Sequence, residues 1–313
     1  LFNIGGEGQA QLGGLGVALV CLALPWPHWT LALLAASLGA ALFGAAWAAI
    51  PAWLQAKRGS HIVITTIMFN YIAASLMIFM LVDVLRPPGK MDPATANFPA
   101  ATNLPSFNEI PGLNLIFTSG VPANVTFFIA IAMAVVVWLL LWRTRLGYQI
   151  RAFGKSEPAA RYAGINPTRI IMIAMLISGA LAGLTGYLWV ARYAVAYVDI
   201  AGGFELDVVA ACVIGGVAIA GGAGSVAGAV MGALFLGIMK NALPVVVLRY
   251  SVAICSSGAS SMRSPIDVAS AAAIGIIAVV LYSKGLIGSS FNIPPPSGCP
   301  STSQLSSTIG SFQ

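Results

Sequence analysis

The stretch that decides the fold is residues 170–190, IIMIAMLISGALAGLTGYLWV. It carries no charged side chain, and about 20 apolar residues in a helix are enough to cross the hydrocarbon core of a bilayer. Its second half repeats small residues at a spacing of four, as in Gly179 and Gly183, which places them on one helix face. Such faces let helix backbones approach closely in lipid. The stretch therefore predicts a membrane-spanning helix that packs tightly against another helix.

The composition of the whole chain supports the same class. Of 313 residues, 58% are hydrophobic and only 8% are charged. Too few polar side chains exist to cover a water-soluble globule, and a disordered chain would be far less apolar. The 34 glycines follow no three-residue period, which excludes collagen. The net charge of +6 is then best explained by cationic loops on the cytoplasmic side of a membrane, and we expect no nucleic-acid partner.

Other apolar runs are bounded by charge, proline or glycine. We predict an all-α, polytopic transmembrane helical bundle with about seven to nine spans or re-entrant helices. The remaining predicted spans are residues 11–24, 30–54, 61–85, 125–142, 208–220, 226–248 and a short, weak one at 268–281. Gly-Gly pairs at 215–216 and 221–222 indicate a broken helix, which is tolerated at membrane depth only against protein or a water-filled cavity.

Lysine and arginine counts predict the orientation. The loop 143–169 holds six basic residues against one acid, so it should be cytoplasmic. Lys57 and Arg58 lie two spans earlier and fall on the same side. The loops 86–122 and 193–207 then face outward, and neither has a basic excess.

Residues for catalysis or metal binding are missing from the sequence pattern. The two histidines, His28 and His61, are far apart, and the four cysteines show no metal-type spacing. Gly154-Lys155-Ser156 resembles the end of a phosphate-binding loop, but that motif needs a glycine at position 149, which is Gln149. We expect no catalytic residue, no metal site and no cofactor bound by this chain, and therefore not an enzyme.

The cytoplasmic loop contains a short predicted helix. Glu157 and Pro158 suit the first helical turn, and Gly164 suits its end. The helix would expose Arg161 and Tyr162. Two interpretations stay open on these residues alone: a basic loop that contacts nothing, or a docking helix for a cytoplasmic partner.

Several ordered segments resemble one family. Residues 151–165, RAFGKSEPAARYAGI, look like the ATPase-docking loop of permeases from ATP-binding cassette (ABC) importers, in the branch for simple sugars, nucleosides and branched-chain amino acids. Residues 2–9, FNIGGEGQ, are similar to an early signature of that branch, and 65–73, TTIMFNYIA, to its nucleoside and simple-sugar subgroup. Residues 203–216 and 221–228 look like the monosaccharide permeases. The resemblance covers about residues 1–245.

The resemblance implies roles for two groups of residues. One group would form the ATPase-coupling element: Gly154, Glu157, Ala159, Ala160, Arg161, Gly164 and Ile165. The other would line the pore or contact substrate: Asn3, Glu7, Gln9, Thr65, Thr66 and Asn70. Thr66 and Asn70 are four apart and share a helix face. Polar groups there suit hydroxyl-rich solutes, and they equally suit hydrogen bonds between helices.

The resemblance also implies partners and a location. The chain would be a multi-pass protein of the bacterial inner membrane, surrounded by membrane lipid, and would form a pore for a simple sugar or nucleoside with a second permease subunit, identical or different. A separate cytoplasmic ATPase would bind ATP and Mg²⁺ and drive transport. A periplasmic or lipid-anchored solute-binding protein would deliver the solute.

Both ends of the chain depart from the family pattern. Family members begin with further membrane helices before the segment matched by residues 2–9, so we expect a piece to be missing at the N-terminus. Similarity ends at about Val247, and the last 63 residues hold 16 serines against 8 in residues 1–250. We therefore predict a transmembrane permease domain over 1–250, with an outer loop at 86–122 and a coupling loop at 143–169. Residues 251–313 would be a weak last span and a Ser/Pro-rich, non-native tail.

Two other functional classes are considered. A stand-alone secondary carrier or channel for a small polar solute is the alternative to the importer. A membrane-embedded enzyme is the third class. The coupling loop and the lack of an acid in mid-span favour the importer over a proton-coupled carrier, and the missing metal or nucleophile cluster disfavours the enzyme.

Overall fold

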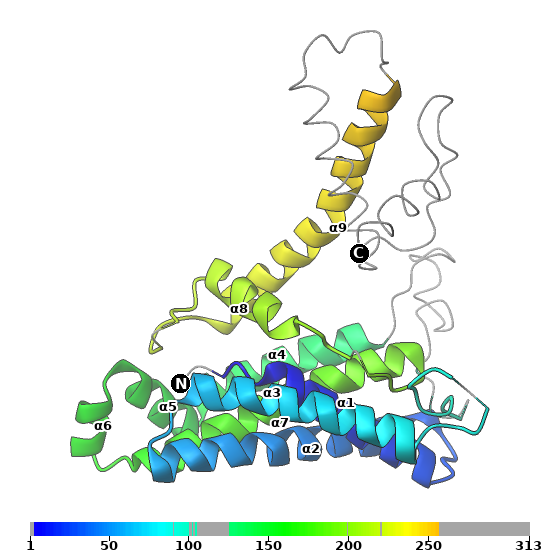
Figure 1. Cartoon of the computed structure of the whole chain (residues 1–313). Helices are drawn as coiled ribbons and strands as arrows, with labels where there is room; N and C mark the ends of the chain where they lie inside the picture. The colour runs from blue at the N-terminus through cyan, green and yellow to red at the C-terminus, as the bar shows by residue number, and fades with distance from the viewer. Residues whose placement is uncertain are drawn as a thin grey trace. The chain divides into compact units, whose positions relative to one another are not determined.

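The computed structural model describes residues 3–89, 91–99, 102, 104, 125–198, 200–219 and 221–256 (Figure 1). Most of these residues lie in helices, and the only β-pairing among them is an isolated bridge between Ala94 and Tyr197. The all-α, polytopic fold predicted from the sequence is confirmed. The predicted span 268–281, the tail beyond it and most of the outer loop lie outside the described residues.

The helices largely follow the predicted apolar runs. In chain order they are α1 (Gly6–Ala23), α2 (Trp29–Arg58), α3 (Ile62–Phe79) with a π-helical end η1 (Met80–Val84), α4 (Thr126–Arg143), α5 (Arg145–Lys155), α6 (Glu157–Tyr162), α7 (Pro167–Tyr193), α8 (Phe204–Ile214) and α9 (Val226–Ser256). Within the described residues, four helices are long and apolar enough to cross a membrane: α2, α3 with η1, α4 and α7. The chain divides into two compact units, Leu1–Ala233 and Leu234–Gln313, and everything discussed as a site lies in the first.

Local sequence signals set the ends of the long helices. His28 caps α2, since its ring nitrogen accepts a hydrogen bond from the Thr30 backbone N–H at 3.3 Å. Gly59 ends the same helix in the left-handed conformation, with φ at 67°. At the start of α7, the side chain of Asn166 accepts from the Arg169 N–H, and Pro167 occupies the first turn.

Small residues hold α1, α2 and α7 together. A Cβ placed on Gly183 of α7 would overlap the carbonyl oxygen of Ala40 and crowd the backbone of Gly44, both on α2. A Cβ placed on Gly13 of α1 would likewise overlap the backbone of Gly183. Gly186 of α7 leaves no room for a side chain against the backbone of α1. The prediction that the small-residue face of 170–190 packs closely against other helices is confirmed.

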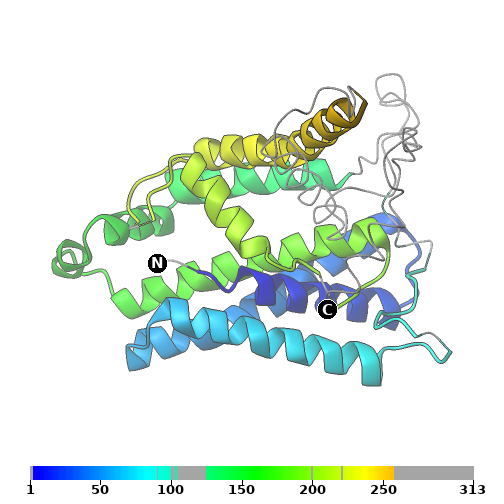
Figure 2. The same cartoon turned by 45° about the horizontal axis from the view of Figure 1, so that its top comes forward.

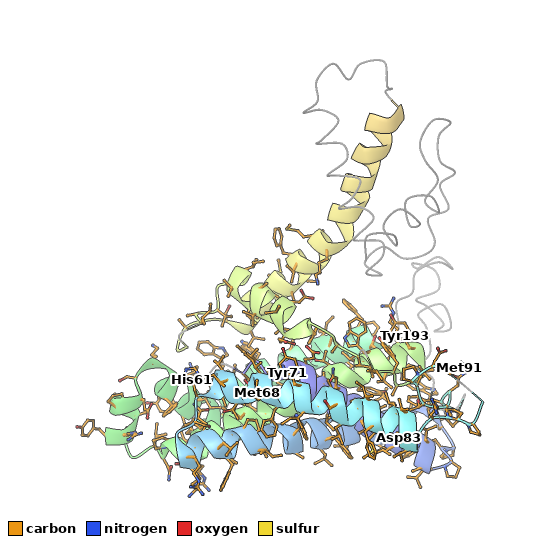
Figure 3. The ribbon with its side chains drawn as sticks, in the orientation of Figure 1. His61, Met68, Tyr71, Asp83, Met91 and Tyr193 are labelled. Atoms are coloured by element: carbon orange, nitrogen blue, oxygen red, sulfur yellow. The ribbon has the colours of Figure 1, made fainter. Side chains whose placement is uncertain are left out.

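The two ends of this helical group separate the basic segments from the segments predicted to face outward. Ala40 lies against Gly183 and Ala48 against Gly179, so α2 and α7 are antiparallel. The basic end of α2 therefore lies at the same end of the group as the loop before α7. At the other end, the Thr95 N–H donates to the Ala196 carbonyl at 2.9 Å, which joins the two segments predicted to face outward. Figure 3 shows His61 and Asp83 at opposite ends of α3 with η1.

Much of the apolar surface faces away from the group. No residue of α4 is buried against the described part of the chain, although the helix is strongly apolar. On α3, Met68 is 53% exposed and Tyr71 is 68% exposed (Figure 3). Surfaces of this kind suit contact with lipid or with another membrane subunit.

The close backbone contact at Gly183 can be tested by adding one methyl group. Gly183→Ala should destabilise the protein by about 1–3 kcal/mol, because the new Cβ meets backbone that cannot move aside. Gly237→Ala is the matched control in a helix interior, where the described residues leave a Cβ free space; it should be neutral or stabilising by up to about 1 kcal/mol. The measurement is the unfolding midpoint of the purified protein in graded SDS. Equal midpoints for both variants would contradict the packing described.

Candidate functional site: the elbow and the polar cluster

A two-helix projection, which we call the elbow (residues 144–166), connects α4 to α7. The hydroxyl of Thr144 caps α5 by accepting from the Gly147 N–H at 3.0 Å. The extended conformation of Ser156 then ends α5, and its hydroxyl caps α6 by accepting from the Ala159 N–H at 3.4 Å. The chain therefore turns sharply between two short helices.

The predicted short helix is present as α6, with the expected start and end. Glu157 and Pro158 form its first turn, and Gly164 follows it with φ at 78°, a left-handed conformation that favours glycine. The Ile165 N–H donates to the Ala160 carbonyl at 3.0 Å, which closes the end of the helix. Tyr162 is 94% exposed.

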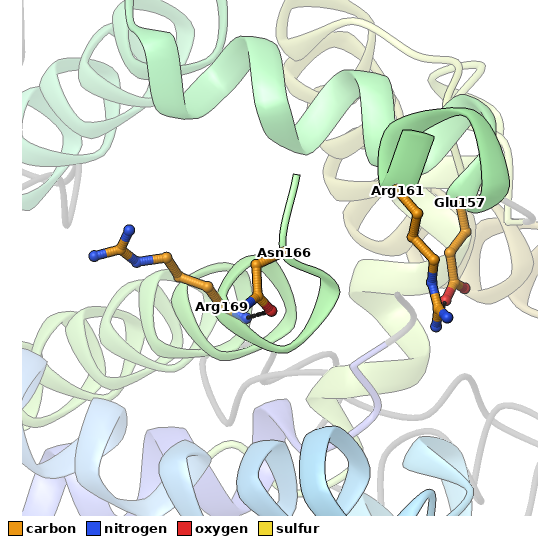
Figure 4. Close-up of polar contacts among 4 residues, drawn as sticks. All are labelled: Glu157, Arg161, Asn166 and Arg169. Atoms are coloured by element: carbon orange, nitrogen blue, oxygen red, sulfur yellow. Dashed lines mark hydrogen bonds and ion pairs between the residues drawn. The ribbon is translucent and has the colours of Figure 1, made fainter. Parts of the chain in front are cut away.

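The predicted coupling residues divide into an inner and an outer set. Ala160 is buried, and Gly154 and Ile165 are half-buried. Glu157, Ala159, Arg161 and Gly164 are exposed. Glu157 and Arg161 form an ion pair of 2.6 Å one turn apart, and Asn166 caps α7 through the Arg169 N–H (Figure 4). The elbow thus presents a small polar surface and is anchored directly to a long helix.

The second contact of the elbow is with the loop at residues 215–225, between α8 and α9, which we call the break loop. Helix α8 ends at Ile214 and α9 starts at Val226, so the predicted break is confirmed. A Cβ on Gly222 would lie 2.6 Å from the carbonyl oxygen of Gly154, and Gly222 itself has φ at 78°. Figure 2 shows the break loop reaching the end of α5. The two backbones therefore touch without a side chain between them.

A cavity of about 380 Å³ lies beside this contact. Its lining comes from four parts of the chain: the elbow, α7, α8 with the break loop, and the segment before α1. The lining residues include Asn3, Phe153, Ser178, Cys212 and Gly222. Most of the lining is apolar, so its polar groups lie mainly at Asn3 and Ser178.

Those two residues belong to a polar cluster at the start of α1. The amide nitrogen of Asn3 donates to Gln9 Oε1 and to Ser178 Oγ, both at 2.9 Å. Gln9 donates back to Asn3 Oδ1 at 3.2 Å and is almost fully buried. Because buried amides are costly without partners, these bonds fix the N-terminal segment against α7.

Helix α3 supplies the rest of the cluster. The Asn70 side chain donates to the Ile4 carbonyl at 2.9 Å and accepts from the Gly8 N–H at 3.0 Å. Thr66 is fully buried, donates to the Ile62 carbonyl of its own helix, and packs against Gly5. The sequence left open whether Thr66 and Asn70 contact solute or make hydrogen bonds between helices. Asn70 makes hydrogen bonds to the segment at the start of α1, and Thr66 makes its hydrogen bond within α3.

The other predicted pore residues lie outside this cluster. Thr65 is half-buried and donates to the carbonyl of His61 within α3. Glu7 accepts from the Gly203 N–H at 3.1 Å, which brings the start of α8 to α1. The six candidates therefore do not share one wall: Asn3 lines the cavity, while Gln9 and Asn70 support it.

Glu7 also lies beside Glu205, a residue outside the four apolar spans. Burial, together with the neighbouring Glu7 carboxyl, raises the pKa of Glu205 to about 7. One Glu205 oxygen is buried without a hydrogen-bond partner among the described residues. Two adjacent carboxyls resist simultaneous ionisation, which adds to the effect of burial in favouring the protonated form of Glu205.

Three residues of this region were not predicted from the sequence. In the sequence, Ser178 falls only within the apolar run 170–190, and Glu205 only within the loop 193–207 and the family-like segment 203–216. Gly222 is noted for a helix break but not for its contact with the elbow. The sequence signal for Ser178 is that it is a hydroxyl side chain among glycines and alanines in an apolar run.

Comparisons with known proteins agree on the family. The model of the family described as "Branched-chain amino acid transport system / permease component" matches residues 1–257. The glucose ABC transporter permease protein TsgB13 of Haloferax volcanii is 32% identical over 192 residues, which are 59% of this chain and 49% of the relative. The guanosine ABC transporter permease protein NupP of Bacillus subtilis is 34% identical over 194 residues, 59% and 51% of the two chains.

A shorter match with higher identity is to the ribose import permease protein RbsC of Escherichia coli K12, 42% identical over 124 residues, 40% of this chain and 38% of the relative. No solved structure matches. The chain spans about half the length, or less, of these curated relatives. The apolar helices and the family together identify a multi-pass inner-membrane protein, as predicted. Because the family model covers most of the residues, the chain belongs to the family of branched-chain amino acid transport system permease components.

Proposed function

We propose that the chain is a permease subunit of an ABC importer and that its elbow is the docking site for the ATPase. The observation that carries this proposal is the elbow itself. Helix α6 is exposed on one side and leads directly into α7, which begins at the Asn166 cap, while the end of the adjoining α5 touches the break loop through Gly154 and Gly222. A partner that moves α6 therefore has a direct mechanical connection to α8.

In the proposed mechanism, ATP and Mg²⁺ bind to a separate cytoplasmic ATPase and none binds to this chain. Closure of that ATPase displaces the elbow, and the Gly154–Gly222 contact transmits the displacement to the break loop and α8. A second permease subunit completes the pore, and a solute-binding protein delivers the solute on the opposite side. The proposed solute is a simple sugar or a nucleoside, which is supported by relatives named for glucose, ribose and guanosine.

A stand-alone carrier remains the second candidate, and one observation favours it. Burial and the neighbouring Glu7 carboxyl raise the pKa of Glu205 to about 7, so this residue binds and releases a proton near neutral pH. Carriers that couple solute to protons use acids within their membrane spans, whereas Glu205 lies outside the four apolar spans, so this observation supports the carrier less than the elbow supports the importer. The two candidates differ in their energy source, which an experiment can separate.

The discriminating experiment is uptake into proteoliposomes with a candidate ATPase and binding protein from the same organism. The importer proposal predicts uptake of labelled sugar or nucleoside only with ATP and the ATPase, and none from a pH gradient alone. Uptake driven by a pH gradient in the absence of the ATPase would overturn it and favour the carrier.

The docking role of α6 can be tested by reversing one charge. Glu157→Lys should lower ATP-driven uptake by about tenfold, because it places a like charge beside Arg161 at the docking surface. Membrane insertion should be unchanged, since the ion pair is exposed and worth at most about 1 kcal/mol. Glu157→Gln is the control that breaks the pair without reversing charge. If Glu157→Lys transports normally, α6 does not dock the ATPase.

The contact between the elbow and the break loop can be tested by comparing alanine variants of the neighbouring residues Gly221 and Gly222. Gly221 and Gly222 both have positive φ, at 90° and 78°, so alanine is strained at either site. Only Gly222 lies against the Gly154 carbonyl; a Cβ on Gly221 would be 3.8 Å from that oxygen. Gly222→Ala should therefore raise the amount of ATP hydrolysed per solute transported well above that of Gly221→Ala. Equal ratios in the two variants would exclude this contact as the transmission point.

A further inference from the structure

A groove of about 810 Å³ lies between the end of α4 and the elbow. We propose that this groove binds the headgroup of an anionic phospholipid from the inner leaflet. The residues that carry the argument are Trp142, Arg143, Arg145, Tyr148 and Arg151. This proposal is independent of the proposed transport function, because it concerns only the binding of a lipid to this groove.

The charge of the groove is one-sided. Arg143, Arg145 and Arg151 line it, and no carboxylate does. The acid nearest along the chain, Glu157, is paired with Arg161. In the described residues none of the three groove arginines makes an ion pair. The site therefore offers guanidinium groups with free capacity for a phosphate, which matches their fork of N–H donors.

One arginine is positioned for this purpose. The Arg151 guanidinium carbon lies 4.2 Å from the centre of the Trp142 ring, so the charged group is stacked and oriented. Its Nε atom is buried and has no hydrogen-bond partner within the described part of the chain. Because this Nε is closed to solvent, a phosphate in the groove would meet the outer N–H groups of the stacked guanidinium, whose charge has no acceptor from the described residues at Nε.

The location of the groove selects a lipid over a soluble anion. The groove opens where α4 ends at Trp142 and Arg143, and this order of aromatic and basic residues is typical of the cytoplasmic membrane interface. Above it, α4 keeps an uninterrupted apolar surface, with Val135, Trp138 and Leu139 each more than 40% exposed. A phospholipid would use both parts, with its phosphate in the groove and its acyl chains along α4. A free phosphate would use only the arginines.

The test is native mass spectrometry of the purified full chain titrated with phosphatidylglycerol or phosphatidylcholine. The triple variant Arg143→Gln, Arg145→Gln, Arg151→Gln should bind phosphatidylglycerol about tenfold more weakly or worse, since each basic residue near an anionic lipid adds to the affinity. The matched control removes three basic residues elsewhere on the same side: Lys57→Gln, Arg58→Gln, Arg169→Gln. It should bind as the native chain does. Phosphatidylcholine binding should not change in either variant.

Three results would overturn the proposal. Equal losses in the two triple variants would indicate general electrostatic attraction. No loss in the groove variant would remove the site. Displacement of phosphatidylglycerol by millimolar inorganic phosphate alone would identify a site for soluble anions.

If the triple variant does not elute as a monodisperse protein, Arg151→Gln alone is measured against Arg169→Gln, with the same expected contrast. Replacing the three arginines by lysine should restore only part of the binding, because the charge remains while the guanidinium fork and its stacking on Trp142 are lost.

Discussion

The structure depends on direct backbone contact between α2 and α7. Helices in lipid gain little from hydrophobic burial, so their association relies on close packing and hydrogen bonds. At Gly44, Gly179 and Gly183 the two backbones approach too closely for any side chain. Helix α1 enters the same contact through Gly13 and through the site opposite Gly186. Three helices are thereby fixed as one group, and the remaining elements are attached to it.

The functional region follows from that group. Because α1 is held against α7, its polar start meets Ser178, and Asn3, Gln9 and Asn70 satisfy one another's hydrogen bonds there. Because α7 begins at the Asn166 cap, the elbow is held at the basic end of the group. The break loop then meets the elbow at Gly222. Polar cluster, cavity and elbow are consecutive parts of one connected region.

Local features were predictable from sequence, while contacts between distant segments were not. The start of α6 at Glu157 and its end before Gly164 follow from capping preferences that act within a few residues. The face of small residues on α7 follows from helical periodicity. The contact of Gly222 with Gly154 and the pairing of Glu7 with Glu205 depend on how α8 returns to the group, and no local pattern encodes that. Asn70 matched a family segment, yet only the structure shows its bonds to the start of α1.

The central claim is that α6 meets an ATPase, and Tyr162 allows the most direct test because it is the last residue of α6 and is 94% exposed. A photoreactive phenylalanine derivative would replace Tyr162 in one sample and Lys57, on the same side of the membrane, in another. After irradiation of native membranes, the account predicts a cross-link from position 162 to a P-loop ATPase subunit and none from position 57. A cross-link from position 57 with none from position 162 would contradict it.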